Sequence, residues 1–435
     1  MGLRPDESLS PTLIEKVVYL GATLRSFPQA EQAAATLLEL PLTSKRIERV
    51  TQRIGAERVA ERDAQVAEWE SLPLMTKLAA PAGVKAAPAV AVSCDGGRLQ
   101  RCDVSADSDK HWREYKAGTL MELETEAHAC DPCPEIPSVF LEADRMERLT
   151  REIGQVAART PQTEPAIASS PVASSSHAGE AVAERAETAP LDTPASVAAS
   201  SDPPHDSRYE PPGVRHRDVC ATLGNSAAFG HQLAALAGML GFAAARLKAF
   251  VADGLPWNWT IWERHFKHLR FVPILDFVHA LTHVFAAATA GRDRDAGWPA
   301  YARWIRWIWQ GDVLLVIAEL AQRQRELGSP PPEASDTDPR KIVCDTLTYL
   351  QNQQSRMNYP EYRRAGLPIT SSHMESTIKE LNGRIKGSEK FWSGRGGEAV
   401  LQLRADLLSD SQPLSTFWAS RADRATGTRS YAQAA

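Results

Sequence analysis

Apolar residues recur at steps of three and four along much of this chain, which is the spacing of a helix that buries one face. The clearest repeat lies in residues 370–392, where Met374, Ile378, Leu381 and Ile385 form a single stripe. Polar and charged residues fill most of the positions between them. We therefore predict one amphipathic helix over 370–392.

Glu375 has two interpretations at the start of this helix. It stands three residues after Ser372, which is the spacing of a capping box. It could instead be a metal ligand, because carboxylates are the ligands that hard divalent cations prefer. The cations that follow it could then hold a polyanion close to that metal, and they are Lys379, Arg384, Lys386 and Lys390.

Helical periodicity also dominates residues 1–80, which we predict to be an all-α module of three or more short helices. Breaks are expected near Pro28 and Pro41, because proline does not continue a helix. The last helix carries cations on its polar side, namely Lys45, Arg46, Arg49 and Arg53. This pattern fits a helix-turn-helix module that binds DNA, and it fits a plain helical bundle with a solvated face equally well.

Short apolar runs alternate with helical patterns in the middle of the chain. We predict strands at 88–97, 115–125, 214–223 and 249–252, separated by helices that end near residues 154 and 241. Two of these strands run into an aspartate followed by glycine, at Asp95 and Asp253. Such an aspartate is often only a turn former. The alternation itself predicts an α/β fold with a mixed sheet covered by helices.

The apolar run 271–290 is expected to begin as a buried strand and to continue as a helix. Asp276 and His279 stand three residues apart in it, which places both on one face of that helix. Helical patterns then continue to about residue 357. They include four tryptophans that we assign to the core rather than to base stacking, namely Trp298, Trp304, Trp307 and Trp309.

Composition changes this picture in one region. Residues 158–212 are rich in Ala, Ser, Pro, Thr and Glu and poor in large apolar residues. Such a segment cannot bury enough surface to offset the entropy lost on ordering, so we predict a disordered linker. We also expect residues 411–435 to be a tail.

Charge and cysteine usage narrow the class of protein. The net charge of −5 over 435 residues means that binding to a nucleic acid must come from local basic faces. Residues 1–13 lack the apolar core of a signal peptide, and the run 271–290 carries Asp276, His279 and His283, so we expect a cytoplasmic protein that does not enter a membrane. Its six cysteines show no disulfide framework, and the pair Cys130 and Cys133 has no evident further zinc ligands.

The candidate chemistry comes from three carboxylates. Ligands of such sheets gather at strand ends, where Asp95 and Asp253 are expected, and the helix of Glu375 could pack across that edge. Three ionised carboxylates in one place require a cation, so the predicted cofactor is Mg²⁺ or Mn²⁺. Two such ions would activate a water or a 3′-hydroxyl for in-line phosphoryl transfer.

Several blocks in this order resemble one family. VSCDGGRLQ, FVADGLPWNW, ILDFVHAL and ITSSHMESTIKELNGRIKGSEKFW are similar to blocks of Asp-Asp-Glu (DDE) transposases of bacterial insertion sequences, in the Mutator-like group. The resemblance covers most of the chain outside the linker and the N-terminal helices. It implies an RNase H-like catalytic core in three pieces, 86–157, 213–278 and 369–410, with a helical insertion over 279–368.

The resemblance also implies roles for particular residues. Asp95, Asp253 and Glu375 would be the catalytic, metal-binding triad, and Asp276 with His279 would match the accessory C/D-x-x-H signature. Asp276 is an alternative second ligand. The four cations after Glu375 would contact DNA phosphates.

The activity implied by the family is metal-dependent cleavage at the ends of a mobile element, followed by transfer of the 3′-hydroxyls into target DNA. The expected partners are double-stranded DNA and a second copy of the chain, in the cytoplasm and on the nucleoid when bound to DNA. Two alternatives are an inactive or domesticated DNA-binding derivative and an RNase H-like nuclease for repair or RNA.

Overall fold

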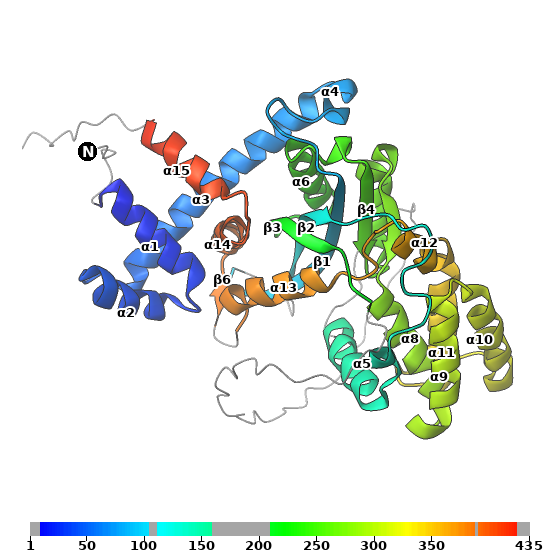
Figure 1. Cartoon of the computed structure of the whole chain (residues 1–435). Coiled ribbons are helices and arrows are strands. Elements are labelled where there is room, and N and C mark those ends of the chain that lie inside the picture. Colours follow the sequence, from blue (N-terminus) through cyan, green and yellow to red (C-terminus); the bar gives the residue numbers. More distant parts are fainter. Residues whose placement is uncertain (1–8, 104–110, 159–208, 388–389, 424–435) are drawn as a thin grey trace, which may run out of the picture.

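One mixed β-sheet forms the centre of the molecule (Figure 1). The structure, a computed structural model, describes residues 9–103, 111–158, 209–387 and 390–423. The strands that it describes are β1 Ala89–Arg101, β2 Trp112–Glu124, β3 Gly213–Thr222, β4 Leu247–Ala252, β5 Val272–Leu275 and β6 Phe391–Trp392. The predicted α/β class is therefore confirmed, while nearly all of the predicted linker 158–212 lies outside the described residues.

The order of the strands is β3-β2-β1-β4-β5, and the short β6 pairs with the far end of β1. β1, β2 and β3 are antiparallel neighbours, whereas β4 runs parallel to β1 and β5 runs parallel to β4. The predicted strands at 115–125, 214–223 and 249–252 match β2, β3 and β4 to within a few residues.

The prediction that the first strand ends in a turn at Asp95 was wrong. β1 continues to Arg101, and Asp95 pairs with Ala117 in the middle of the β1–β2 ladder. The glycines after Asp95 have a packing role instead. A Cβ on Gly97 would stand 2.1 Å from Cζ of Tyr115, so glycine leaves the space that this ring occupies.

Helices cover both faces of the sheet. α6 Ser226–Met239 and α7 Pro256–Ile261 lie on one face, where Phe229 and Leu233 of α6 approach Gly118 of β2. α13 Ser372–Ile385 and α14 Gly394–Leu407 lie on the other face, where they share a core cluster with Leu99, Tyr115 and residues of β3. Side chains alternate between the two faces along each strand.

The predicted helix over 370–392 was correct in its face and wrong in its length. Met374, Leu381 and Ile385 are buried and Ile378 is half-buried, as the periodicity indicated. The helix ends at Ile385, because the indole N–H of Trp392 donates to the carbonyl of Ile385 at 2.9 Å and leads the chain back as β6.

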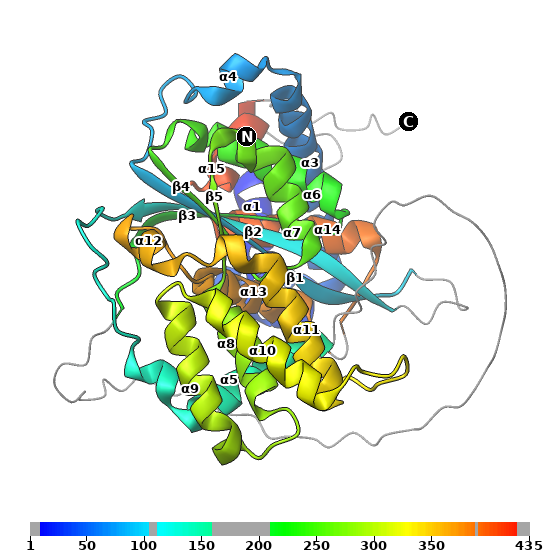
Figure 2. The same cartoon turned by 90° about the vertical axis from the view of Figure 1, so that its right-hand side faces the viewer.

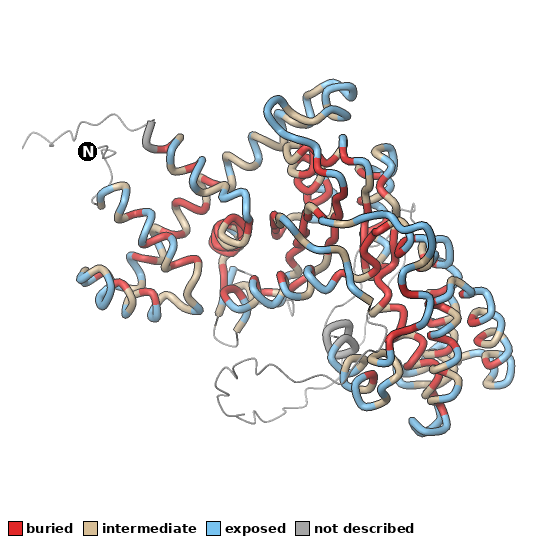
Figure 3. Tube along the Cα trace, viewed as in Figure 1, coloured by how far each residue is buried: buried red, intermediate tan, exposed pale blue. Residues whose placement is uncertain are grey.

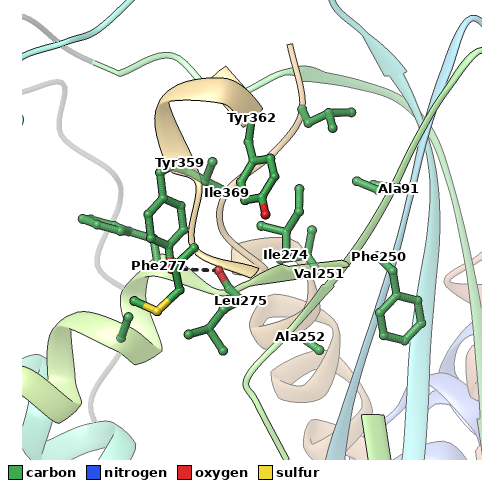
Figure 4. Packing of buried hydrophobic residues seen from close by; sticks show 14 of the residues in the cluster. Ala91, Phe250, Val251, Ala252, Ile274, Leu275, Phe277, Tyr359, Tyr362 and Ile369 are labelled. Atoms are coloured by element: carbon green, nitrogen blue, oxygen red, sulfur yellow. Dashed lines mark hydrogen bonds between the residues drawn. The ribbon is translucent and has the colours of Figure 1, made fainter. Parts of the chain in front are cut away.

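A helical segment follows β5 and precedes α13. It contains α8 Phe277–Thr289, α9 Arg294–Trp309, α10 Val313–Leu327, α11 Pro339–Gln353 and α12 Tyr359–Arg364. Its helices α8 to α11 lie below the sheet in Figure 2, and its core is continuous with that of the sheet. Trp304 and Trp309 are buried, and Trp298 and Trp307 pack against the same core. Figure 4 shows where this body joins the sheet, with Tyr359, Tyr362 and Ile369 against Val251, Ile274 and Leu275.

The N-terminal helices are not a separate unit. α1 Pro11–Thr23 and α2 Phe27–Leu38 precede α3 Ser44–Ser71, a single helix of 28 residues, and the short α4 Leu74–Leu78. α3 crosses α14, where a Cβ on Gly55 would stand 2.4 Å from the carbonyl oxygen of Ala399. It then reaches α6, where the ring of Trp69 covers Gly238.

The C-terminal segment packs against the N-terminal helices and α14 (Figure 3). We expected a tail from residue 411, but α15 Pro413–Asp423 is a helix whose Phe417 is buried against Ile14 and Leu403. α5 Ala143–Ala158 packs beside α8 through Met146. Among the helices that the structure describes, none is both long and apolar enough to cross a membrane.

Candidate active site

Asp95 and Asp253 come together on neighbouring parallel strands. The pairing of β1 with β4 runs to Ser93 opposite Val251. Parallel strands advance by the same rise per residue, so two residues further on Asp95 lies level with Asp253, just beyond the end of β4. The strand-end position predicted for both aspartates therefore holds for Asp253, while Asp95 reaches the same edge from the middle of a longer strand.

The side chain of Asp95 points toward α13. Its neighbour Cys94 faces α7, where the thiol contacts Oδ1 of Asn258 at 3.4 Å, so alternation directs Asp95 to the opposite face. Burial, and then the charge of Asp253, raise the pKa of Asp95 to about 7. A hydrogen bond of 2.6 Å from the N–H of Gly96 and the charge of His279 act in the other direction.

Asp253 is held by the turn that follows it. Its Oδ1 accepts hydrogen bonds from the N–H of Leu255 at 3.0 Å and from the amide of Asn258 at 2.5 Å. Burial raises the pKa of this carboxyl, while the charge of His279 and the Leu255 N–H oppose the rise. Asn258 is fully buried. Its side-chain amide donates to Asp253 and its side-chain oxygen accepts from the thiol of Cys94, so this residue connects the end of β4 to β1.

Asp276 is saturated with hydrogen bonds. It is the N-cap of α8, and its Oδ1 accepts from the N–H groups of Val278 at 2.6 Å and His279 at 3.1 Å. Its Oδ2 accepts from both the N–H and the hydroxyl of Ser371, each at 2.5 Å. A carboxylate offers about four lone-pair positions, and all four are used. This geometry favours Asp253 over Asp276 as a metal ligand. The hydrogen bonds of Asp276 instead connect the start of α8 to the start of α13.

His279 lies among the carboxylates. Burial alone would lower its pKa, but the charges of Asp276, Asp253, Asp95 and Glu375 together raise it. When it is protonated, the imidazole of His279 offsets part of the negative charge of these carboxylates.

Glu375 lies in the first turn of α13, and its side chain does not form the predicted capping box. The N-cap is Ser371 rather than Ser372, and it makes no side-chain capping bond, because its hydroxyl donates to Asp276 instead. Burial raises the pKa of Glu375, and the charge of Asp276 adds to the effect. The half-buried carboxylate of Glu375 thus belongs to the electrostatic surroundings of Asp95, Asp276 and His279.

The four cations after Glu375 differ in their exposure to solvent. Lys379 and Lys386 are exposed, as phosphate contacts require. Lys390 is half-buried, and its ammonium donates to the carbonyls of Gly383 and Lys386 at the end of α13.

Arg384 contradicts the prediction that it contacts DNA. It is buried, its Nε donates to the carbonyl of Gly21 at 2.8 Å, and its guanidinium lies 4.4 Å from the ring centre of Phe27. Burial lowers its pKa to about 10. Arg384 therefore holds α13 to the N-terminal helices.

The donor chemistry fits a divalent cation, although the described residues do not present a finished ligand set. Asp95 and Asp253 are hard oxygen donors at one sheet edge, and burial raises the pKa of both carboxyls. In the part of the chain that the structure describes, no three His, Cys, Asp or Glu side chains stand close enough together to hold a metal. Cys130 is exposed, whereas Cys133 is buried and its thiol donates to the carbonyl of Glu135 at 3.3 Å.

The residues that position this site were not found from the sequence. Asn258, Tyr349 and Ser371 all bond to Asp253 or Asp276, and the last two are close to them only in the folded chain. The one local signal was an asparagine between two tryptophans in PWNWTI, five residues after Asp253. No protein-family model matches the chain, and no curated protein matches it significantly.

Proposed function

We propose that the chain is a DDE-type transposase, which cuts DNA at the ends of a mobile element and transfers the freed 3′-hydroxyls into target DNA. The observation that carries the proposal is the meeting of Asp95 and Asp253 at one sheet edge, with the helix of Glu375 tied to the same edge through Asp276 and Ser371. Asp95 and Asp253 are distant in sequence and lie level at this edge, and the helix that carries Glu375 begins next to them. An ordinary turn or cap does not require this arrangement.

The fold supports the proposal. The order β3-β2-β1-β4-β5, with three antiparallel strands followed by two parallel ones, is the order expected of an RNase H-like core. The helical body formed by α8 to α12 lies between the second aspartate and the glutamate, where the resemblance places an insertion. We therefore propose an RNase H-like catalytic core for this mixed sheet.

Asp95, Asp253 and Glu375 would hold the Mg²⁺ or Mn²⁺. When bound, the metal supplies an activated oxygen nucleophile and stabilises the leaving oxygen. Asp276 keeps α13 at the sheet edge, and His279 balances the acidic charge. Asn258 fixes the rotamer of Asp253.

The proposed substrate is double-stranded DNA, bound by a homodimer or a larger assembly in the cytoplasm and on the nucleoid. Lys379 and Lys386 are the exposed cations one to three turns beyond Glu375, and each would contact a phosphate. The cations of α3 include the exposed Lys45, Arg46 and Arg49. We therefore propose that this helix takes part in recognising the element ends.

Cleavage of the DNA that flanks the reading frame tests the proposal. With Mg²⁺ or Mn²⁺, wild type should nick end-bearing duplexes, and Glu375→Gln should fall below about a thousandth of that rate while still binding DNA. Glu380→Gln is the matched control on the exposed side of the same helix. Equal activity of wild type and Glu375→Gln would remove the assignment of Glu375.

The same assay separates the two alternatives. Specific DNA binding without cleavage under either metal would identify an inactive, domesticated derivative. Cleavage of hybrids or branched DNA without any need for element ends would identify a nuclease of the repair type.

A further inference from the structure

The turn after Asp253 is held from outside by the helical insertion. The hydroxyl of Tyr349 donates to the backbone carbonyl of Asp253 at 2.8 Å, across 96 residues of sequence. The side-chain amide of Gln353 donates to the carbonyl of the next residue, Gly254, at 3.0 Å. Both donors belong to α11 and stand four residues apart, so they point from one helical face at two consecutive carbonyls.

Gly254 makes this approach possible. Its φ of 100° lies in the region that glycine adopts without strain. A Cβ at this position would stand 2.8 Å from Cε2 of Tyr349. The contact between turn and insertion is therefore as close as a backbone without a side chain allows.

The donors on α11 are themselves fixed. The ring of Tyr349 stacks on His283 of α8, with ring centres 3.9 Å apart and planes 22° from parallel. Gln353 is buried, and its Oε1 accepts from Arg356 at 3.0 Å. The guanidinium of Arg356 in turn lies 4.3 Å from the ring centre of Trp259 in α7. Gln353 is therefore connected through Arg356 to the helix that follows Asp253.

We infer that Tyr349 and Gln353 are positioning residues, through which the insertion sets where the carboxylate of Asp253 stands relative to Asp95. The side chain of Asp253 is oriented by Leu255 and Asn258 of its own turn, but the height of that turn above the end of β4 is fixed by α11. The inference rests on the proposed function, because it assigns these residues to the metal-binding geometry of Asp253.

Tyr349→Phe tests this with the loss of one hydroxyl. Tyr301→Phe is the matched control, because Tyr301 also lies in the insertion and donates its hydroxyl to a backbone carbonyl, that of Phe140, at 3.0 Å. Binding of Mn²⁺ to the full-length proteins is measured without DNA by the loss of the free-ion paramagnetic resonance signal. Nicking rates against Mn²⁺ and DNA concentration, and unfolding midpoints, are measured on the same proteins.

We expect Tyr349→Phe to bind Mn²⁺ about tenfold more weakly, as the loss of an outer-shell partner does, and Tyr301→Phe to bind it as wild type does. Nicking by Tyr349→Phe should recover at high Mn²⁺ with the KM for DNA unchanged, although both variants lose similar stability. Gln353→Leu should weaken Mn²⁺ binding in the same direction.

Two results would overturn the inference, and they differ. If wild type binds Mn²⁺ and cleaves DNA, but the two tyrosine variants bind the ion equally, the insertion does not position Asp253 and the proposed function stands. If wild type neither binds Mn²⁺ nor cleaves, the proposed function fails and this inference fails with it.

Discussion

The carboxylate of Asp276 accepts hydrogen bonds from both the N–H and the hydroxyl of Ser371, which lies 95 residues later in the chain. The first residue joins β5 to α8, and the second begins the helix that carries Glu375. The same carboxylate caps α8 through Val278 and His279. One buried side chain therefore sets the start of two helices that border the acidic cluster.

Asp276→Asn should lower both stability and nicking. The amide has one acceptor oxygen in place of two, so it cannot satisfy the four donors that now converge on the carboxylate. We expect a loss of roughly 2–4 kcal/mol in the free energy of unfolding, measured by urea denaturation. Ser371→Ala removes only the hydroxyl and should cost about half as much. An Asp276→Asn protein as stable as wild type would contradict the role of Asp276 in connecting the starts of α8 and α13.

Asp95→Asn should stabilise the metal-free protein, and more so at high pH. The folded pKa of Asp95 is raised from 3.8 to about 7, so the folded state binds the proton more tightly than the unfolded state does. Stability is therefore lost as the pH rises from about 4 to about 7, and the loss is constant above that. Removing the charge should recover up to roughly 4 kcal/mol at pH 8 and much less at pH 5.

This gain is measured by denaturation in a chelating buffer at both pH values. A catalytic group whose charge burdens the fold is expected to behave in this way, whereas a turn-forming aspartate would destabilise the protein when replaced. An Asp95→Asn protein that is less stable than wild type at pH 8 would therefore return Asp95 to a structural role.

Lys379→Ala and Lys386→Ala should weaken DNA binding without changing stability. The side chain of Lys379 is exposed on α13, and that of Lys386 is exposed directly after the helix ends. If each contacts one phosphate, each substitution should reduce the slope of log affinity against log salt by about one, for any DNA sequence. Titrations at several salt concentrations give this slope, and an unchanged slope in both variants would place the DNA elsewhere.

Arg384→Ala should show the opposite behaviour. The guanidinium contacts the rings of both Phe27 and Trp392 and bonds to the carbonyl of Gly21, so its removal leaves a cavity and an unpaired carbonyl. We expect a loss of about 2–4 kcal/mol in stability. At temperatures where the variant is folded, the salt dependence of its DNA binding should equal that of wild type.

Local patterns were sufficient for most of the elements. Alternating and helical repeats placed β2, β3, β4, α6 and the buried stripe of α13 within a few residues of their observed positions. Such repeats indicate which face of an element is apolar, and this can be read from the spacing of residues within that element.

The errors came from contacts between distant segments. Asp95 was predicted to end a strand because two glycines follow it, but those glycines leave space for side chains of β2, such as the ring of Tyr115. Arg384 stands among polar residues of its helix, yet it is buried because α1 and α2 pack over it. The cap of α13 moved to Ser371 because Asp276 binds its hydroxyl. Spacing within one helix carries no information about any of these partners.

The continuity of α3 limits how this protein could be cut or recombined. Its 28 residues extend about 42 Å, from the first two helices across α14 to α6. Along this length Arg58 pairs with the buried Asp406, and Arg62 bonds to Glu398 and Gln402. A fragment that began after residue 80 would leave Asp406 without its guanidinium and would uncover the side of α14 around Ala399. A chimera that exchanges residues 1–80 between related chains would therefore have to exchange α14 as well, so this boundary is not available for grafting a new recognition module.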